Sequence, residues 1–106
     1  MSTLRAKGTP VINVPIDMSH GIFYGRITVV TSGTRVQGPD VYNEAGFHLR
    51  AMPANTGIVF VGNNAVTTAN GFPMSAGNSF IVSVDNLNQL FFDASAASQV
   101  IAWFKE

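Results

Sequence analysis

The sequence predicts a single all-β domain, and three observations support this. The chain of 106 residues has the usual size of one domain and is long enough to bury a hydrophobic core. Short runs rich in Val, Ile, Phe and Thr are separated by clusters of Gly, Asn, Pro and Ser, which is the pattern of strands joined by turns. The Ala- and Ser-rich stretch Ala94–Ser98 is too short to be a stable helix on its own. Regular spacing of short strands favours a sandwich or barrel over a βαβ fold.

The expected strands are the β-branched and aromatic runs between these turn clusters. In chain order they are Val11–Ile16, Ile22–Thr31, Thr34–Gln37, Phe47–Met52, Ile58–Val61, Ala65–Thr68, Ser79–Val84, Leu90–Asp93 and Gln99–Phe104.

Local residue choices add detail to this pattern. The segment Val61–Ala65 contains Gly and two Asn residues that tolerate positive φ, which predicts a tight hairpin. The runs Ile58–Val61 and Leu90–Phe92 are apolar at successive positions, so we expect one face in the core and the other against a neighbouring element or chain. Trp103 lies in the last apolar strand and is expected in the core rather than as a platform for sugars.

Residues 1–8 have no strand pattern and are expected to form an N-terminal arm, with residues 9–106 as one sandwich domain. No charged and apolar leader opens the chain, and no apolar run approaches the roughly 20 residues of a membrane span. We therefore expect synthesis in the cytoplasm and no membrane partner.

Charged residues are scarce. They make up 11% of the chain, against roughly 25% in soluble domains, and six basic residues balance six acidic ones. A surface without net charge promotes association, and neutral polar groups lose less than charges when water is removed, so the composition favours a surface covered by other proteins. A neutral monomer with an Asn-rich surface is the alternative. No cluster of Lys and Arg predicts nucleic-acid binding.

The residue types used in catalysis and metal binding are not grouped along the sequence. The chain has no Cys, and its two histidines, His20 and His48, lack the spacing of metal ligands. Asp17, Ser19 and His20 are the parts of a nucleophilic triad, but neighbours along a strand point to opposite faces. The acidic residues of loop 38–46 have no acidic partner across a groove, and the glycines form no phosphate-binding motif. We expect no enzyme activity, metal, cofactor or small-molecule substrate.

Two segments carry a resemblance to a known group of proteins. Residues 54–62 (Ala-Asn-Thr-Gly-Ile-Val-Phe-Val-Gly) and 71–79 (Gly-Phe-Pro-Met-Ser-Ala-Gly-Asn-Ser) resemble small β-rich structural proteins of tailed bacteriophages. In that pattern an N-T-G turn enters an apolar strand, and a G-x-P-[LM]-x-x-G-x-S segment leads into the next one. Residues 85–95 and the closing strand Val100–Phe104 resemble the end of the same pattern, so the resemblance covers the chain from Phe47 onward.

The resemblance implies a jelly-roll-like β-sandwich or barrel that is a virion structural protein, decorating and cementing the capsid. The implied partners are the major capsid protein, or another virion protein, and further copies of the chain, with a homotrimer favoured. The implied location is the capsid surface. A tail, baseplate or fibre adaptor and a host-glycan-binding, lectin-like module are the alternatives. The expected partner interface consists of Leu4, Arg5 and Lys7 in the arm and Asp40, Tyr42 and Glu44 in loop 38–46.

Overall fold

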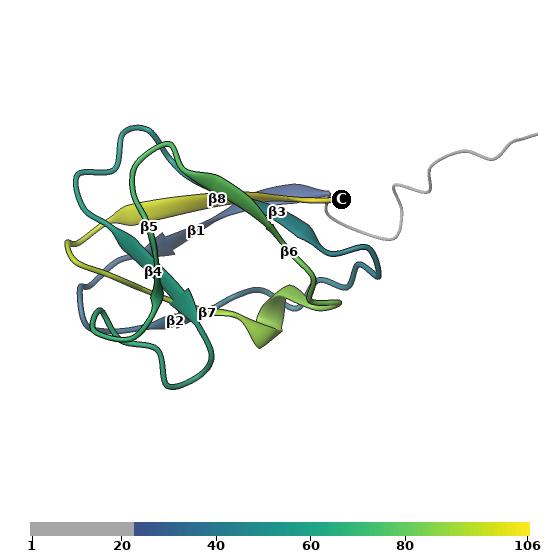
Figure 1. Cartoon of the computed structure of the whole chain (residues 1–106), viewed down its shortest axis with the longest axis horizontal. Coiled ribbons are helices and arrows are strands. Elements are labelled where there is room, and N and C mark those ends of the chain that lie inside the picture. The colour runs from purple at the N-terminus through teal and green to yellow at the C-terminus, as the bar shows by residue number, and fades with distance from the viewer. Residues whose placement is uncertain (1–22) are drawn as a thin grey trace, which may run out of the picture.

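The computed structural model describes residues 23–106, which form two antiparallel four-stranded sheets packed as a β-sandwich (Figure 1). The all-β prediction is confirmed for these residues. The expected arm and the expected strand Val11–Ile16 lie outside them. The strands are β1 (Tyr24–Val29), β2 (Val36–Gln37), β3 (Phe47–Ala51), β4 (Val59–Gly62), β5 (Phe72–Met74), β6 (Ser79–Val82), β7 (Phe91–Ala94) and β8 (Gln99–Lys105), and a 3-10 turn, η2 (Leu87–Gln89), precedes β7.

The strands pair in a nested pattern. β1 pairs with β8, β2 with β7, β3 with β6, and β4 with β5. Two further pairs, β3 with β8 and β4 with β7, complete the sheets, whose orders are β1-β8-β3-β6 and β2-β7-β4-β5. Every connection between consecutive strands except β4–β5 passes from one sheet to the other. Within residues 23–106, β4 and β5 are therefore the innermost of the nested pairs, and β1 and β8 are the outermost.

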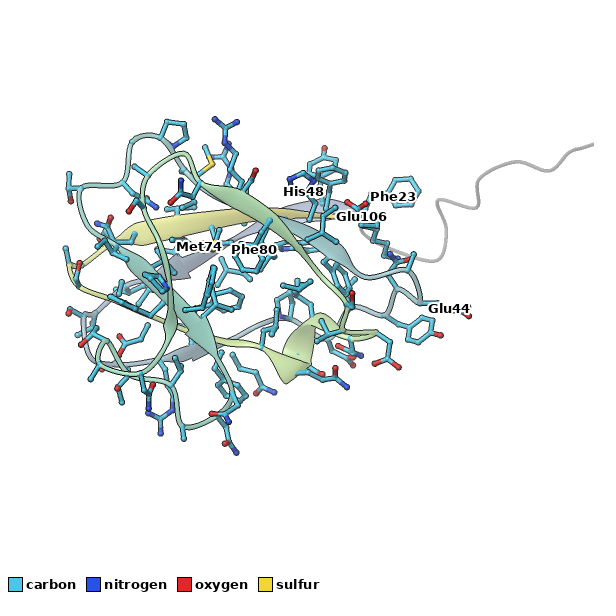
Figure 2. All side chains as sticks on the ribbon, in the orientation of Figure 1. Phe23, Glu44, His48, Met74, Phe80 and Glu106 are labelled. Carbon is cyan, nitrogen blue, oxygen red and sulfur yellow. The ribbon has the colours of Figure 1, made fainter. Side chains whose placement is uncertain are left out.

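The core lies between the sheets because the strands alternate. In β3, Phe47, Leu49 and Ala51 are buried, whereas the residues between them face outward. Trp103 in β8 is 4% exposed and packs edge-to-face on Phe47, with ring centroids 6.0 Å apart, so its predicted core position is confirmed. The other buried apolar residues are Ile27, Val29, Val59, Val61, Val66, Met74, Leu87, Phe92, Ala94 and Ile101. Figure 2 shows Met74 and Phe80 lying between the two sheets.

The segment between β4 and β5 differs from the prediction. Residues 65–68 are not a strand, and the expected tight hairpin at 61–65 is wrong, because β4 pairs with β5 across a longer loop. Within residues 23–106, Ser98 is the non-glycine residue with a positive φ, so Asn63 does not adopt the positive φ that the predicted hairpin would allow. The side chain of Asn63 instead accepts a hydrogen bond from the Ala65 N–H. β5 was missed because it contains Pro73, which is tolerated here because β5 is the edge strand of its sheet.

The asparagines hold the chain's own loops. Six Asn side chains form hydrogen bonds with backbone groups at turns and connections, namely Asn43, Asn55, Asn63, Asn70, Asn78 and Asn86. Such side chains replace the backbone partners that a turn lacks. Much of the Asn content is thus explained by internal turns, and it does not by itself indicate contact with another protein. Within residues 23–106, no helix is both long and apolar enough to cross a membrane.

Candidate functional site

The candidate site is the outer face of the β1-β8-β3-β6 sheet. Strand register places Tyr24 opposite Phe104, Phe104 opposite His48, and His48 opposite Ile81, so these four side chains form one row across all four strands. Tyr24 is 73% exposed, Ile81 57% and Phe104 48%. Contiguous apolar side chains at a protein surface are typical of interaction sites. This row is therefore the apolar part of the site.

A second row lies next to the first and contains the charge. Arg26 and Arg50 are both opposite Ala102, one on each side of it. Because Ala102 is small, the two rows enclose a hollow of about 700 Å³, which Tyr24 and Phe104 also line. The hollow has two arginines at its sides, an alanine at its base and aromatic rings along one edge. We call this surface, made by the two rows, the outer face.

His48 is held flat against the outer face. Its ring stacks on Phe104 with centroids 5.0 Å apart and 25° between the planes, and its Nδ1 lies 3.5 Å from Oε2 of Glu106. Figure 2 shows His48 and Glu106 at the same end of the sandwich as Phe23. The imidazole thus lines the hollow together with Phe104, on which it stacks.

The arginines of the outer face have no acidic neighbour in the described part of the chain. Within residues 23–106, the close contact between a basic and an acidic side chain is the one between His48 and Glu106. No carboxylate of that range lies within 4 Å of Arg26 or Arg50, both of which are exposed. Apart from Glu106 beside His48, the outer face is therefore basic as well as aromatic, although the chain as a whole has a net charge of zero.

Three of the six predicted interface residues lie together in the loop between β2 and β3, which is separate from the outer face. Asp40, Tyr42 and Glu44 are exposed in the loop between β2 and β3, and Tyr42 is 60% exposed. We call residues 38–46 the acidic loop. Figure 2 shows Glu44 toward the same end as His48. Leu4, Arg5 and Lys7, the other three predicted residues, lie outside the described residues.

The acidic loop is fixed by residues around Asn86. The Asn86 Nδ2 donates to Oδ1 of Asp40 at 2.8 Å, and Tyr42 forms an isolated β-bridge with Asn86. The N–H of Asn43 donates to the backbone oxygen of Asp85 at 2.8 Å, which brings a third exposed carboxylate beside the loop. The acidic loop is thus an ordered corner with an aromatic side chain at its centre.

The outer face itself was missed at the level of sequence, although a signal for it exists. Tyr24 and Arg26 are two residues apart in one strand, and His48 and Arg50 are two apart in another. Period-two spacing puts each pair on one side of its strand. The sequence does not reveal that β1 and β3 both pair with β8, and this pairing is what brings the two arginines to one hollow.

The buried polar side chains stabilise loops. Asp93 Oδ1 accepts from the N–H of Gly33 at 2.9 Å, and Gln99 Oε1 accepts from the N–H of Gly57 at 2.8 Å. Within residues 23–106, no group of three or more His, Cys, Asp or Glu side chains could hold a metal ion. Residues 17–20, which include the rejected triad, lie outside that range.

No protein-family model, curated protein or solved structure matches this chain. The functional argument therefore depends on the outer face and the acidic loop.

Proposed function

We propose that this chain is a structural protein that binds other protein chains and that it decorates and stabilises the capsid of a tailed bacteriophage. The outer face is the observation that supports protein binding. It combines exposed Tyr24, Phe104 and Ile81 with Arg26 and Arg50 in one continuous area. Tyr, Phe and Arg are enriched at protein interfaces, where aromatic side chains and Arg contribute most of the binding energy.

The proposal includes a jelly-roll fold. Its support is the nested pairing, in which the first strand pairs with the last and each following strand with the one before, across two four-stranded sheets. Double-sheet jelly rolls have eight strands and occur in viral capsid proteins and in lectins. A fold of this kind is compatible with a capsid role, but one fold serves many functions, so the function is argued from the surface residues.

The viral assignment comes from the resemblance of residues 54–62 and 71–79 to phage structural proteins. The same resemblance supports the major capsid protein as a partner, the capsid surface as the location and a homotrimer as the assembly. The proposed arm, residues 1–8, has other support, namely the lack of a strand pattern in that segment. Closed symmetry is also the common solution for chains that associate with themselves. With 11% charged residues, the chain has little charge repulsion to oppose such assembly.

A host-glycan-binding role is the second candidate. The observation that favours it is the hollow of about 700 Å³, because an aromatic ring beside two Arg side chains can stack on a sugar and donate hydrogen bonds to it. A glycan array would show retention of the purified chain, and retention would be lost in a Tyr24→Ser, Arg50→Ser variant.

The decisive test is the position of the chain in the particle. Virions are purified from infected cells, the chain is quantified by mass spectrometry, and its density is located in a low-resolution map. We expect many copies on the outside of the capsid. A few copies in the tail would favour the adaptor alternative, and absence from the virion would contradict the proposal.

A further inference from the structure

The acidic loop and the outer face have complementary shapes and charges. In the acidic loop, the exposed Tyr42 lies two residues from Asp40 on one side and two residues from Glu44 on the other. On the outer face, Ala102 lies at the base of a hollow with an arginine on each side. The loop thus presents an aromatic side chain between two carboxylates, and the face presents a hollow between two guanidinium groups.

We propose that the outer face binds the acidic loop of a second copy of this chain. Tyr42 of one copy enters the hollow above Ala102 of the next copy, and its two flanking carboxylates reach Arg26 and Arg50. This contact rests on the proposed function in one respect, because it supplies the self-association that the homotrimer requires.

The spacing on the two sides is compatible. Arg26 and Arg50 belong to strands separated by β8 alone, so their Cα atoms lie about 10 Å apart at the usual strand spacing. The four steps from Asp40 to Glu44 span at most about 14 Å when extended. Arg side chains are long and form paired, charge-assisted hydrogen bonds with carboxylates, so they can bridge the remaining difference.

The chemistry of the hollow suits the loop's central residue. Tyr24 and Phe104 line the hollow and are exposed, so a docked Tyr42 ring would remove apolar surface from water on both copies. Aromatic side chains that fill such pockets are the usual anchors of protein interfaces. The loop is already ordered by Asn86, so docking requires little additional ordering of its backbone.

Charge distribution identifies the occupant as a second copy. The formal net charge is zero, yet in the described part of the chain the outer face is basic while Asp40, Glu44 and Asp85 gather at the acidic loop. Two identical copies therefore do not repel each other as whole molecules and attract each other when face meets loop. Because the two surfaces differ, the contact is head-to-tail, and it gives a closed ring when the rotation between successive copies closes after a whole number of copies.

Charge-swapped variants of the full chain test this contact. Arg26→Glu with Arg50→Glu reverses the face, Asp40→Arg with Glu44→Arg reverses the loop, and a four-substitution chain carries both changes. Sedimentation velocity measures self-association of each chain, with its melting temperature as a check on folding. We expect the face variant and the loop variant each to associate at least tenfold more weakly than the wild type. The four-substitution chain is expected to recover association, because its reversed face and reversed loop are again complementary.

One control and one further test variant accompany these chains. Arg35→Glu changes an exposed arginine outside the outer face, whose Nη1 donates to the Val66 oxygen at 3.3 Å, and should leave association unchanged. Tyr42→Ser should weaken association without changing any charge. Since every variant is scored against the four-substitution chain, a folding defect in one of them cannot imitate the expected rescue.

The outcomes separate this inference from the proposed function. If the wild type forms oligomers and the reversed variants associate equally well, the face–loop contact is wrong and capsid decoration is unaffected. A four-substitution chain that stays dissociated while it is folded also contradicts the contact. If the wild type is monomeric at about 100 μM, the contact is again wrong, and the virion experiment alone decides the proposed function.

Discussion

The side-chain amide of Asn55 pairs with the backbone of Val100 as a neighbouring strand would. Its Nδ2 donates to the Val100 oxygen and its Oδ1 accepts from the Val100 N–H, both at 2.9 Å. Next to it, the N–H of Met52 also donates to the Val100 oxygen at 3.0 Å. The connection from β3 to β4 is thereby attached to β8, even though it contributes no strand there.

The first prediction is that Asn55→Ala lowers the free energy of unfolding by about 1–2 kcal/mol, because the partly buried Val100 N–H loses its partner and the Val100 oxygen keeps only the bond from Met52. For a domain of this size, each 1 kcal/mol lowers Tm by about 4–8 °C, so calorimetry can measure it. Asn64→Ala is the matched control, since Asn64 is exposed and forms no side-chain hydrogen bond within residues 23–106. Equal effects of both changes would contradict this role of Asn55.

The second prediction concerns Gly46, which has φ = 95° and follows the acidic loop's turn into β3. In Gly46→Ala the new Cβ would overlap the backbone oxygen of Val82, in addition to the cost of a left-handed conformation. We expect a loss of about 3 kcal/mol or more in urea unfolding. Gly33→Ala isolates the conformational part, because Gly33 has φ = 86° and open space around it, and should cost about 1 kcal/mol. If the two variants were equally stable, the contact with Val82 would be unimportant.

The third prediction is that Trp103→Phe is nearly neutral. The indole Nε1 of Trp103 is buried and has no hydrogen-bond partner within residues 23–106, and the ring lies so close to Gly25 that a Cβ there would be 3.0 Å from it. Removing an unpaired buried donor recovers about 1–3 kcal/mol, which offsets the lost packing. Trp103→Ala leaves a cavity and should cost about 3–5 kcal/mol. Denaturant unfolding of both variants checks this, and a similar large loss in both would show that Nε1 is paired in solution.

The fourth prediction separates binding from stability on the outer face. Tyr24→Ser and Ile81→Ser change exposed side chains, so unfolding free energies should stay within about 0.5 kcal/mol of the wild type. The fraction of each variant that co-sediments with capsids should fall below that of the wild type, and so should its self-association. Phe72→Ser serves as the control, because Phe72 is 58% exposed but belongs to the other sheet. If capsid and self-binding stayed at wild-type level in both outer-face variants, the outer face would not be an interface.

The fold class could be predicted because alternation and turn residues are local properties. Every described strand except β5 was predicted within two residues of its bounds, since each contains a run of β-branched or aromatic residues between turn residues. β1, β3 and β8 also alternate between inward and outward positions over at least five residues. The segment 65–68 imitated a strand because it contains Val66 and two Thr residues. Val66 is buried for a different reason, namely its packing against Gly62 and Gly71. That contact is local to the end of β4 and the loop after it, and it produces no periodic pattern in the sequence.

The site could be predicted only in part. Asp40, Tyr42 and Glu44 were placed together because they are neighbours in sequence. The outer face depends on register between β1, β8 and β3, and register follows from long-range pairing that single-sequence patterns do not contain. The sequence likewise does not reveal that Asn55 is bonded to Val100, which is 45 residues away along the chain.

The nested pairing also sets an order of events during synthesis. β4 and β5 are neighbours in sequence and can pair as soon as both have left the ribosome, whereas β1 must wait for β8, which is the last strand to emerge. Closing the shorter loop first costs less chain entropy, so pairing proceeds outward from the β4–β5 hairpin. The outer face needs β1, β3 and β8 together, so this surface forms only after β8 has been synthesised. A nascent chain that has not reached β8 therefore lacks the hollow between Arg26 and Arg50.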